Sequence, residues 1–208
     1  MFKDLKTDCQ KYSYCLALQI VGQLKNLDIE IDKKVIMDTL DEMLVKDGNP
    51  DISQQEFSKC MSLMNEMIEK AQAIKENNES IEKQTGDAFR AENGKREGVK
   101  TLQSGLQIEV LREGTGRCPK VTETVKVHYE GALVNGTVFD SSYKRGEPIS
   151  FPLDRVISGW TEGLMHTKLG SKVKLVIPPE LGYGARGAGA EIPPYATLIF
   201  TVELLDIE

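Results

Sequence analysis

The stretch Val127-His-Tyr-Glu-Gly-Ala-Leu-Val-Asn-Gly-Thr-Val-Phe-Asp140 decides the fold of the second half of the chain. Apolar residues alternate with polar ones from Val125 onward, which predicts a strand with one buried face. Tyr129 lies on the apolar face and His128 on the opposite one, so we expect His128 to point away from any site that contains Tyr129. Asn135-Gly136 is a strong signal for a tight hairpin turn.

The sequence around this stretch predicts an α+β domain. Most of the 18 glycines and 8 prolines of the chain lie in residues 100–208, as turns between short strands require. Further strands are predicted at 106–110, 172–177 and 197–205, and a short helix at 154–164. The domain, which we expect over 100–208, is therefore an antiparallel sheet wrapped on a short helix.

The first half of the chain has the apolar spacing of helices. The pattern predicts a helix over 3–24 and a second one that begins with Asp32 as N-cap and ends before Pro50. Ser53 and Glu56 fit a capping box at the start of a long helix over about 53–91. Its polar second part is expected to cross solvent, so we divide this half into a helical module (1–52) and a connecting arm (53–94).

Such short helices form a poor core by themselves. A second copy of the chain is the natural partner for their apolar stripes, which predicts a helical dimerisation module and a homodimer. The alternative is a monomer whose helices pack on the second domain. Met61 and Met64 are interpreted as core or interface residues, whereas the role of Met67 stays open.

Composition excludes several classes of function. The chain has 208 residues and a net charge of −6 without a basic patch, so we expect no nucleic-acid partner. There is no C-x-x-C motif and there are only two histidines, so neither a metal site nor a cofactor is expected. The 4 cysteines, interpreted as free thiols, and the lack of a long apolar run favour a cytoplasmic protein without a membrane anchor. A periplasmic or surface location applies if a signal peptide was removed.

Five segments occur in an order and at a spacing that resemble the FKBP family of peptidyl-prolyl cis/trans isomerases, over about half of the chain. They are Val127–Gly131, Gly136–Ser142, Val156–Gly163, Ile177–Gly184 and Ile192–Phe200. The helical first half is similar, more loosely, to the dimeric bacterial FKBPs of the macrophage infectivity potentiator type. The resemblance implies the family's sheet-on-helix fold and activity on X–Pro bonds of unfolded or partly folded protein clients.

The bottom-up chemistry agrees with this resemblance. Resonance gives a peptide bond a rotation barrier of about 18–20 kcal/mol, and only X–Pro bonds populate both isomers appreciably. An apolar pocket with fixed donors disfavours the dipolar planar amide relative to the twisted one, and this requires no nucleophile or metal. The resemblance implies that the catalytic residues are Tyr129, Phe139, Asp140, Trp160, Tyr183 and Phe200, and that the substrate-binding residues are Phe151, Val156, Ile157, Ile192 and Arg145.

The resemblance also implies a separate role for each of several of these residues. Trp160 forms the floor beneath the proline ring, the Ile157 N–H and the Tyr183 hydroxyl hold substrate carbonyls, and Asp140 faces the amide, steadied by Tyr129 and Arg145. A macrolide ligand is implied as well, although Ile149, Ala188 and Glu191 depart from the family's pattern around the pocket. The alternative function is a dimeric holding chaperone for unfolded proteins.

Overall fold

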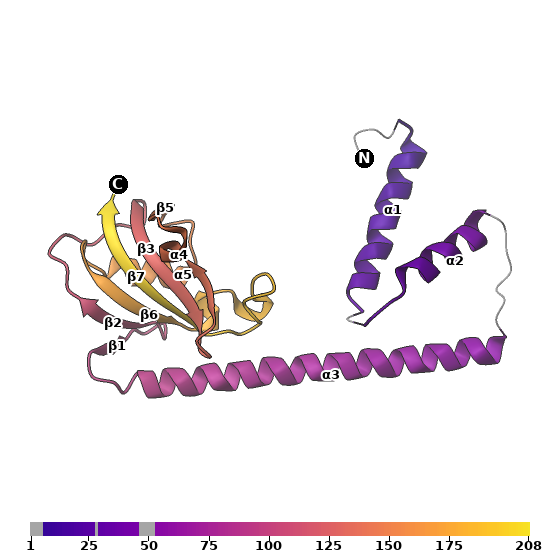
Figure 1. Cartoon of the computed structure of the whole chain (residues 1–208), viewed down its shortest axis with the longest axis horizontal. Helices are drawn as coiled ribbons and strands as arrows, with labels where there is room; N and C mark the ends of the chain where they lie inside the picture. Colours follow the sequence, from indigo (N-terminus) through magenta and orange to yellow (C-terminus); the bar gives the residue numbers. More distant parts are fainter. Residues whose placement is uncertain (1–5, 28, 46–52) are drawn as a thin grey trace. The chain divides into compact units, whose positions relative to one another are not determined.

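The computed structural model describes residues 6–27, 29–45 and 53–208. Contacts divide the chain into two units, Met1–Glu76 and Asn77–Glu208, and the long helix α3 contributes to both (Figure 1). The predicted division into 1–52, 53–94 and 100–208 stays a prediction, because part of it falls on residues outside those described. The predicted end of the second helix before Pro50 also lies outside them.

The first unit contains α1 (Asp8–Lys25), α2 (Lys33–Val45) and the start of α3. Helix α1 begins later than the sequence pattern predicted, because Thr7 and Gln10 form a capping box. The side chain of Asp32 accepts hydrogen bonds from the N–H groups of Lys34 (2.9 Å) and Val35 (3.2 Å), which confirms it as the predicted N-cap.

Helix α3 runs without interruption from Gln54 to Asn93. Its predicted capping box is present: the Glu56 N–H donates to the Ser53 hydroxyl (3.2 Å), and the Glu56 carboxylate accepts from the Ser53 N–H (3.1 Å). None of the helices in the described part of the chain combines the length and apolar character that a membrane span requires.

The second unit is built on a seven-stranded antiparallel sheet in the order β1-β2-β6-β7-β3-β4, with β5 paired to β3. The strands are β1 (Val99–Thr101), β2 (Gln107–Arg112), β3 (Thr124–Leu133), β4 (Val138–Ser141), β5 (Ile149–Pro152), β6 (Lys172–Ile177) and β7 (Leu198–Ile207). Burial alternates strictly along β3, as the sequence predicted. The turn at Asn135-Gly136 is also confirmed, since Gly136 has φ 87° and the Gly136 N–H donates to the Leu133 carbonyl (2.9 Å).

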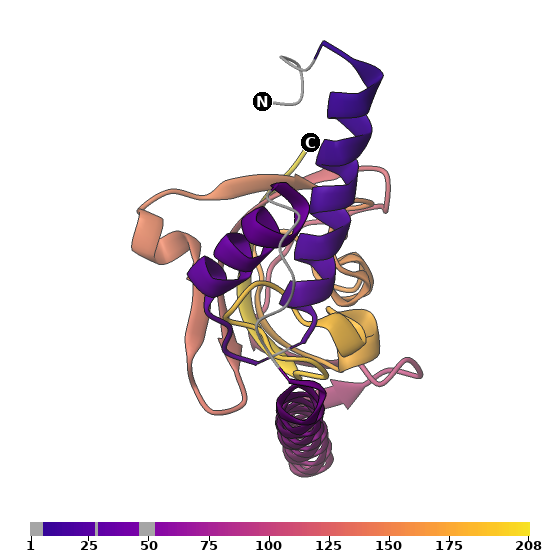
Figure 2. The same cartoon turned by 90° about the vertical axis from the view of Figure 1, so that its right-hand side faces the viewer.

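The core lies between the sheet and the short helix α5 (Ser158–Met165), around which the strands curve (Figures 1 and 2). Helix α5 begins four residues later than predicted, because residues before Ile157 form a turn closed by the Arg155 N–H and the Pro152 carbonyl (3.0 Å). Gly159 and Gly163 let the helix approach the sheet. A Cβ on Gly159 would lie 2.5 Å from Ile177, and one on Gly163 2.8 Å from Leu175.

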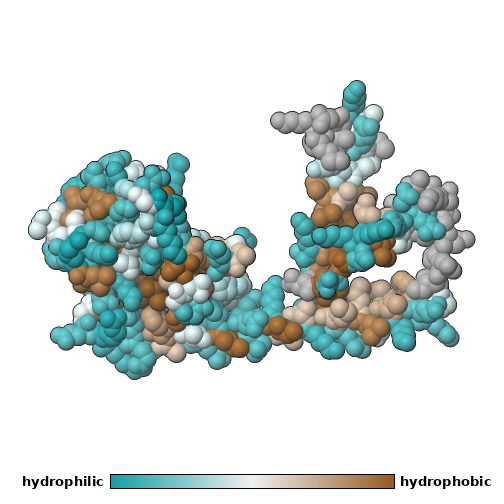
Figure 3. Space-filling model, viewed as in Figure 1, coloured by the Kyte–Doolittle hydropathy of each residue, from teal (hydrophilic) through white to brown (hydrophobic). Residues whose placement is uncertain are grey.

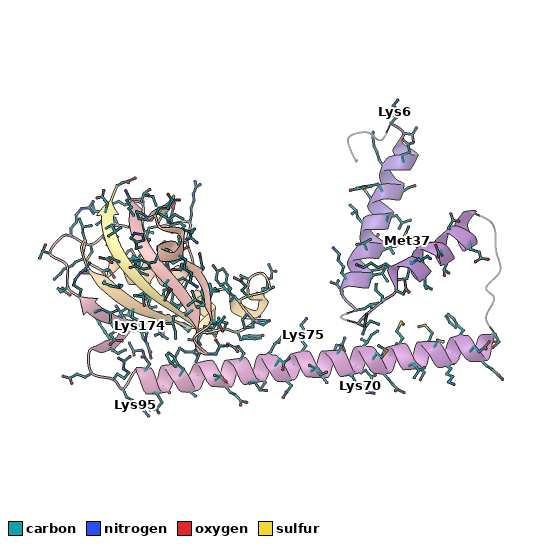
Figure 4. All side chains as sticks on the ribbon, in the orientation of Figure 1. Lys6, Met37, Lys70, Lys75, Lys95 and Lys174 are labelled. Carbon is teal, nitrogen blue, oxygen red and sulfur yellow. The ribbon has the colours of Figure 1, made fainter. Side chains whose placement is uncertain are left out.

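The end of α3 packs against the sheet of this unit, which differs from the solvent-crossing arm that the sequence suggested. Gly86 and Asn93 are buried, and the Asn93 amide donates to the side-chain oxygen of Gln107 on β2 (2.8 Å). In Figure 4, Lys95 marks the turn after α3 and Lys174 marks β6, with side chains of helix and sheet filling the space between them. These turns contact the sheet domain through Gly86, Arg90 and Asn93, and their polar sequence gave no indication of such a contact.

Candidate active site

Side chains from four strands, α5 and the loop after β6 line one cavity of about 540 Å³ in the second unit. The strands position these side chains by their alternation, since Tyr129 on β3 pairs with Val202 on β7 and Gly131 pairs with Phe200. The lining residues are Tyr129, Phe139, Asp140, Phe151, Arg155, Val156, Ile157, Trp160, Tyr183, Ile192 and Phe200.

The inner wall of the cavity is a set of aromatic rings packed edge to face around Trp160. Its indole ring lies at 86° to the ring of Tyr129 (centroids 5.1 Å apart) and at 87° to that of Phe151 (5.6 Å). Phe139 meets Phe200 in the same manner at 5.5 Å and 83°. Each of these rings packs edge to face on at least one other ring, so the apolar surface is preformed rather than assembled around a ligand.

The polar side of the cavity is a three-residue network. The Tyr129 hydroxyl and the Arg145 guanidinium both donate hydrogen bonds to the Asp140 carboxylate, and Arg145 also donates to the Tyr129 oxygen (3.0 Å). Burial opposes ionisation of Asp140, but the hydrogen bonds from Tyr129 and Arg145 outweigh it and hold the pKa of Asp140 below its usual value. Burial, aided by the hydrogen bond to Asp140, raises the pKa of Tyr129. At neutral pH the network therefore contains a carboxylate and a neutral phenol.

Two donors at the rim are free to receive a ligand. Ile157 is the N-cap of α5, and in the described part of the chain its N–H has no hydrogen-bond partner. The hydroxyl of Tyr183, which is 40% exposed, likewise has no partner among the described residues. An N–H at a helix start favours a carbonyl oxygen or other negative charge, so the rim can bind an extended peptide backbone.

Ten of the eleven site residues predicted from sequence line this one cavity. Arg145 does not line it; its guanidinium instead lies 5.6 Å from the Tyr129 ring and binds Asp140, as the predicted steadying role requires. Arg155 was not predicted from the sequence. It is an exposed cation on the cavity rim and has no side-chain partner among the residues described. Its position next to Val156 was the one signal that could have identified it.

His128 points away from the cavity, as its parity on β3 predicted. Its ring stacks on Tyr143 (centroids 4.7 Å apart, planes at 14°), and its Nδ1 lies 3.0 Å from the Ser142 hydroxyl. Across the described residues no group of three or more metal-binding side chains occurs.

One cavity of the second unit thus combines packed aromatic rings, a polar edge and two donors at its rim. Residues 115–205 match the family model described as FKBP-type peptidyl-prolyl cis-trans isomerase, and residues 9–110 match the domain amino-terminal to such isomerases. The chain belongs to the FKBP-type peptidyl-prolyl cis-trans isomerases, and its activity is the isomerisation of X–Pro bonds in protein substrates.

Relatives resemble the chain over nearly its whole length. A probable FKBP-type peptidyl-prolyl cis-trans isomerase of Haemophilus influenzae is 44% identical over 99% of this chain and 88% of its own. The isomerase FkpA of Escherichia coli K12 is 42% identical over 98% of this chain and 77% of its own. The crystal structure of FkpA from Escherichia coli matches with a TM-score of 0.69 at 40% identity, covering 98% of each chain.

Proposed function

We propose that the aromatic cavity is where the chain isomerises X–Pro bonds. Trp160 holds the proline ring from below, and the rings of Tyr129, Phe139 and Phe200 enclose it. The Ile157 N–H and the Tyr183 hydroxyl hold the carbonyls on either side, so that one part of the peptide stays fixed while the other rotates. The observation that carries the proposal is the coincidence of a preformed apolar wall with these two free donors.

The catalytic contribution is electrostatic and geometric. The planar amide has the larger dipole, so transfer from water into an apolar cavity weakens its solvation more than that of the twisted amide. The ionised Asp140 lies at the edge of the cavity, held by Tyr129 and Arg145, and faces the amide as it loses its resonance. Fixed dipoles of this kind lower a barrier without reorganisation at the moment of rotation.

A protease-coupled assay with a short X–Pro peptide tests the site. Phe139→Ala removes one wall, and we expect kcat/KM to fall at least about tenfold, which is a loss of about 1.4 kcal/mol. Phe57→Ala is the matched control, because Phe57 is exposed on α3, outside the second unit. Equal activity of the two variants, with both folded, would place catalysis elsewhere.

We propose that the helices of the first unit form a homodimer with a second copy of the chain. Apolar residues of this unit are strongly exposed, including Val35 (59%), Met37 (65%) and Phe57 (55%). A groove of about 490 Å³ between α1 and α2 is lined by six apolar residues and two lysines: Val21, Leu24, Lys25, Ile29, Ile31, Lys33, Ile36 and Met37. Figure 3 shows this apolar surface in brown over α1 and α2. Exposed apolar surface of this kind marks an interaction site, and a second copy of the chain would cover it.

Light scattering on the full chain tests the dimer. We expect twice the mass of one chain, which is 23.1 kDa. Met37→Glu places a charge on the exposed apolar surface and should shift the mass to that of one chain, whereas Lys70→Glu, on a charged stretch of α3, should leave the dimer intact. A single-chain mass for the unaltered protein would contradict the proposal.

The same exposed apolar surface favours a second candidate function, in which the helices hold unfolded clients. Aggregation of an unfolded model protein, measured in the presence of the unaltered chain or of the Met37→Glu variant, separates the holding function from the isomerase activity. A holding function predicts weaker suppression of aggregation by the variant at unchanged activity on short peptides. Clients are proposed to be unfolded or partly folded chains that contain proline.

A macrolide would use the same cavity, and the small side chain of Ala188 in the loop over it leaves little apolar contact for such a ligand, so we expect weak inhibition. The relatives do not support the cytoplasmic location expected from sequence, and we propose the periplasmic alternative, which fits them. Cell fractionation of the native host tests it.

A further inference from the structure

The last turns of α3 contact the loop that closes the cavity. This pocket loop (residues 182–197) follows β6 and leads into β7, and it supplies Tyr183 and Ile192 to the cavity. Thr197 at its end is completely buried, and its hydroxyl accepts a hydrogen bond from the Arg90 guanidinium. The two residues are 107 positions apart in the sequence.

A glycine permits this contact. A Cβ on Gly86 would lie 2.3 Å from the Thr197 hydroxyl oxygen, closer than atoms can pack, and 3.1 Å from the Thr197 Cβ, which is a tight contact. Glycine costs a helix interior about 0.5–1 kcal/mol relative to alanine. Its place inside the last turns of α3 therefore serves the close approach of helix and loop.

A second contact reaches further into the pocket loop. The ammonium of Lys83 lies 5.8 Å from the ring centroid of Tyr195, within range of a cation–π interaction. Tyr195 has φ 59°, a left-handed conformation that is unfavourable for a residue with a bulky side chain. Its N–H donates to the Gly184 carbonyl (2.9 Å), so helix and loop together hold the strained turn.

The same loop carries Ile192, which lies three residues before Tyr195 and is 7% exposed in the wall of the cavity. Its backbone pairs with Ala188 through two hydrogen bonds, of 2.9 Å and 3.1 Å. Arg90 and Lys83 thus contact Thr197 and Tyr195, which follow Ile192 in the same loop.

We infer that Arg90 and Thr197 are positioning residues of the isomerase site, through which the last turns of α3 hold the pocket loop in its substrate-binding conformation. The inference rests on the proposed site, since it assigns Ile192 to substrate binding. Neither residue touches the cavity, so both act through the loop. The loop binds the peptide, so its displacement acts first on KM and less on kcat.

Full-chain variants at Thr197 separate the hydrogen bond from simple packing. Thr197→Val keeps the shape and removes the acceptor, whereas Thr197→Ser keeps the acceptor. We expect Thr197→Val to raise KM about three- to tenfold, the range that the net contribution of one typical hydrogen bond allows. Thr197→Ser should stay within about twofold of the unaltered chain. Equal effects of the two variants would overturn the inference.

Arg90→Gln provides the second arm and Arg96→Gln its matched control. Arg96 binds Glu109 on β2 at 2.9 Å and 3.1 Å, so it also ties the helix end to the sheet, but at a place away from the pocket loop. Arg90→Gln should raise KM as Thr197→Val does, and Arg96→Gln should not. A rise in KM with both arginine variants would indicate general loosening of the helix end and overturn the assignment.

Amide hydrogen exchange gives a readout independent of activity. The N–H groups of Ala188 and Ile192 are hydrogen-bonded within the pocket loop, and we expect both to exchange at least about threefold faster in Thr197→Val, with exchange in β3 unchanged. Unchanged exchange in the loop would overturn the inference. If the unaltered chain failed to isomerise X–Pro peptides, the proposed function would fail while exchange still tested the positioning.

Discussion

Trp160 and Phe200 meet edge to face, with ring centroids 5.2 Å apart and planes at 86°. Phe200 lies on β7 and Trp160 on α5, so this contact joins the sheet to the helix at the floor of the cavity. Both residues are 4% exposed. The face that would receive a proline ring is therefore also part of the hydrophobic core, and changes to it affect binding and stability together.

Trp160→Leu should lower both the activity and the stability of the chain. Leucine fills part of the volume but lacks the flat face and the edge-to-face contacts, so we expect kcat/KM to fall about tenfold and the protein to lose about 2–4 kcal/mol of stability. Urea denaturation and the peptide assay measure the two quantities. Trp160→Phe, which keeps a flat ring, should retain most of both. Equal losses in the two variants would mean that the flat ring contributes nothing specific.

Gly131→Ala should distort the cavity without touching its polar side. A Cβ at this position would lie 2.6 Å from the ring of Phe200 and 2.7 Å from that of Phe139, so both rings must move. Overpacking of this kind costs about 1–3 kcal/mol of stability. We expect a lower melting temperature together with a several-fold loss in kcat/KM. Gly136→Ala is the control: it is strained at its positive φ but meets no atom within 4 Å, so it should lower stability alone.

The activity should show no titration near neutral pH. The pKa of Asp140 lies below its usual value of about 3.9 and that of Tyr129 lies above its usual value of about 10, so kcat/KM should be flat from about pH 5 to 9. Ionised Asp140 stabilises the folded chain above its unfolded pKa, and this stabilisation is lost as the pH falls through the lower folded pKa. An inflection between pH 6 and 8 would contradict this.

Asp140→Asn tests whether the charge or the shape of that residue matters. Asparagine preserves the volume and can still accept a hydrogen bond, but it removes the ion pair with Arg145. We expect a several-fold decrease in kcat/KM. The acid-induced decline in stability that is due to Asp140 should disappear. An unaltered decline at low pH would assign it to other carboxylates.

Arg155 should give the site a preference for acidic peptides. Its guanidinium lies on the cavity rim without a side-chain partner in the described part of the chain. An interaction of about 1 kcal/mol with a nearby carboxylate corresponds to a preference of about fivefold. The measurement compares peptides with Glu or Lys before proline, in low and high salt. Arg155→Gln should reduce the ratio toward one, whereas Arg186→Gln, outside the cavity lining, should not.

The sequence predicted the β domain well because its signals are local. The alternation on β3 and the Asn135-Gly136 turn each depend on residues within a few positions of one another, and so does the capping box at Ser53 in the helical half of the chain. The ordered segments also brought ten of the eleven named site residues to one cavity. Exposed Arg155 has no local pattern, so its place on the rim emerged only from the fold.

Contacts between distant segments could not be predicted in this way. No local pattern marks Gly86 as a contact point, yet its missing side chain makes room for Thr197. Asn93 and Arg90 similarly have polar side chains whose partners lie on β2 and before β7. A helix rich in charged residues is interpreted as solvated when its sequence alone is known. The sequence pattern shows that its side chains are polar but does not show which distant residues they contact.

Trp160 is the single tryptophan of the chain, and its indole Nε1 is buried without a hydrogen-bond partner among the described residues. Ultraviolet emission excited at long wavelength therefore originates from one ring, at the floor of the cavity. A peptide or macrolide that covers this ring changes the dielectric around the fluorophore, so occupancy can be titrated on the unlabelled protein. The chain carries its own optical probe of ligand binding, at the position where a ligand would rest.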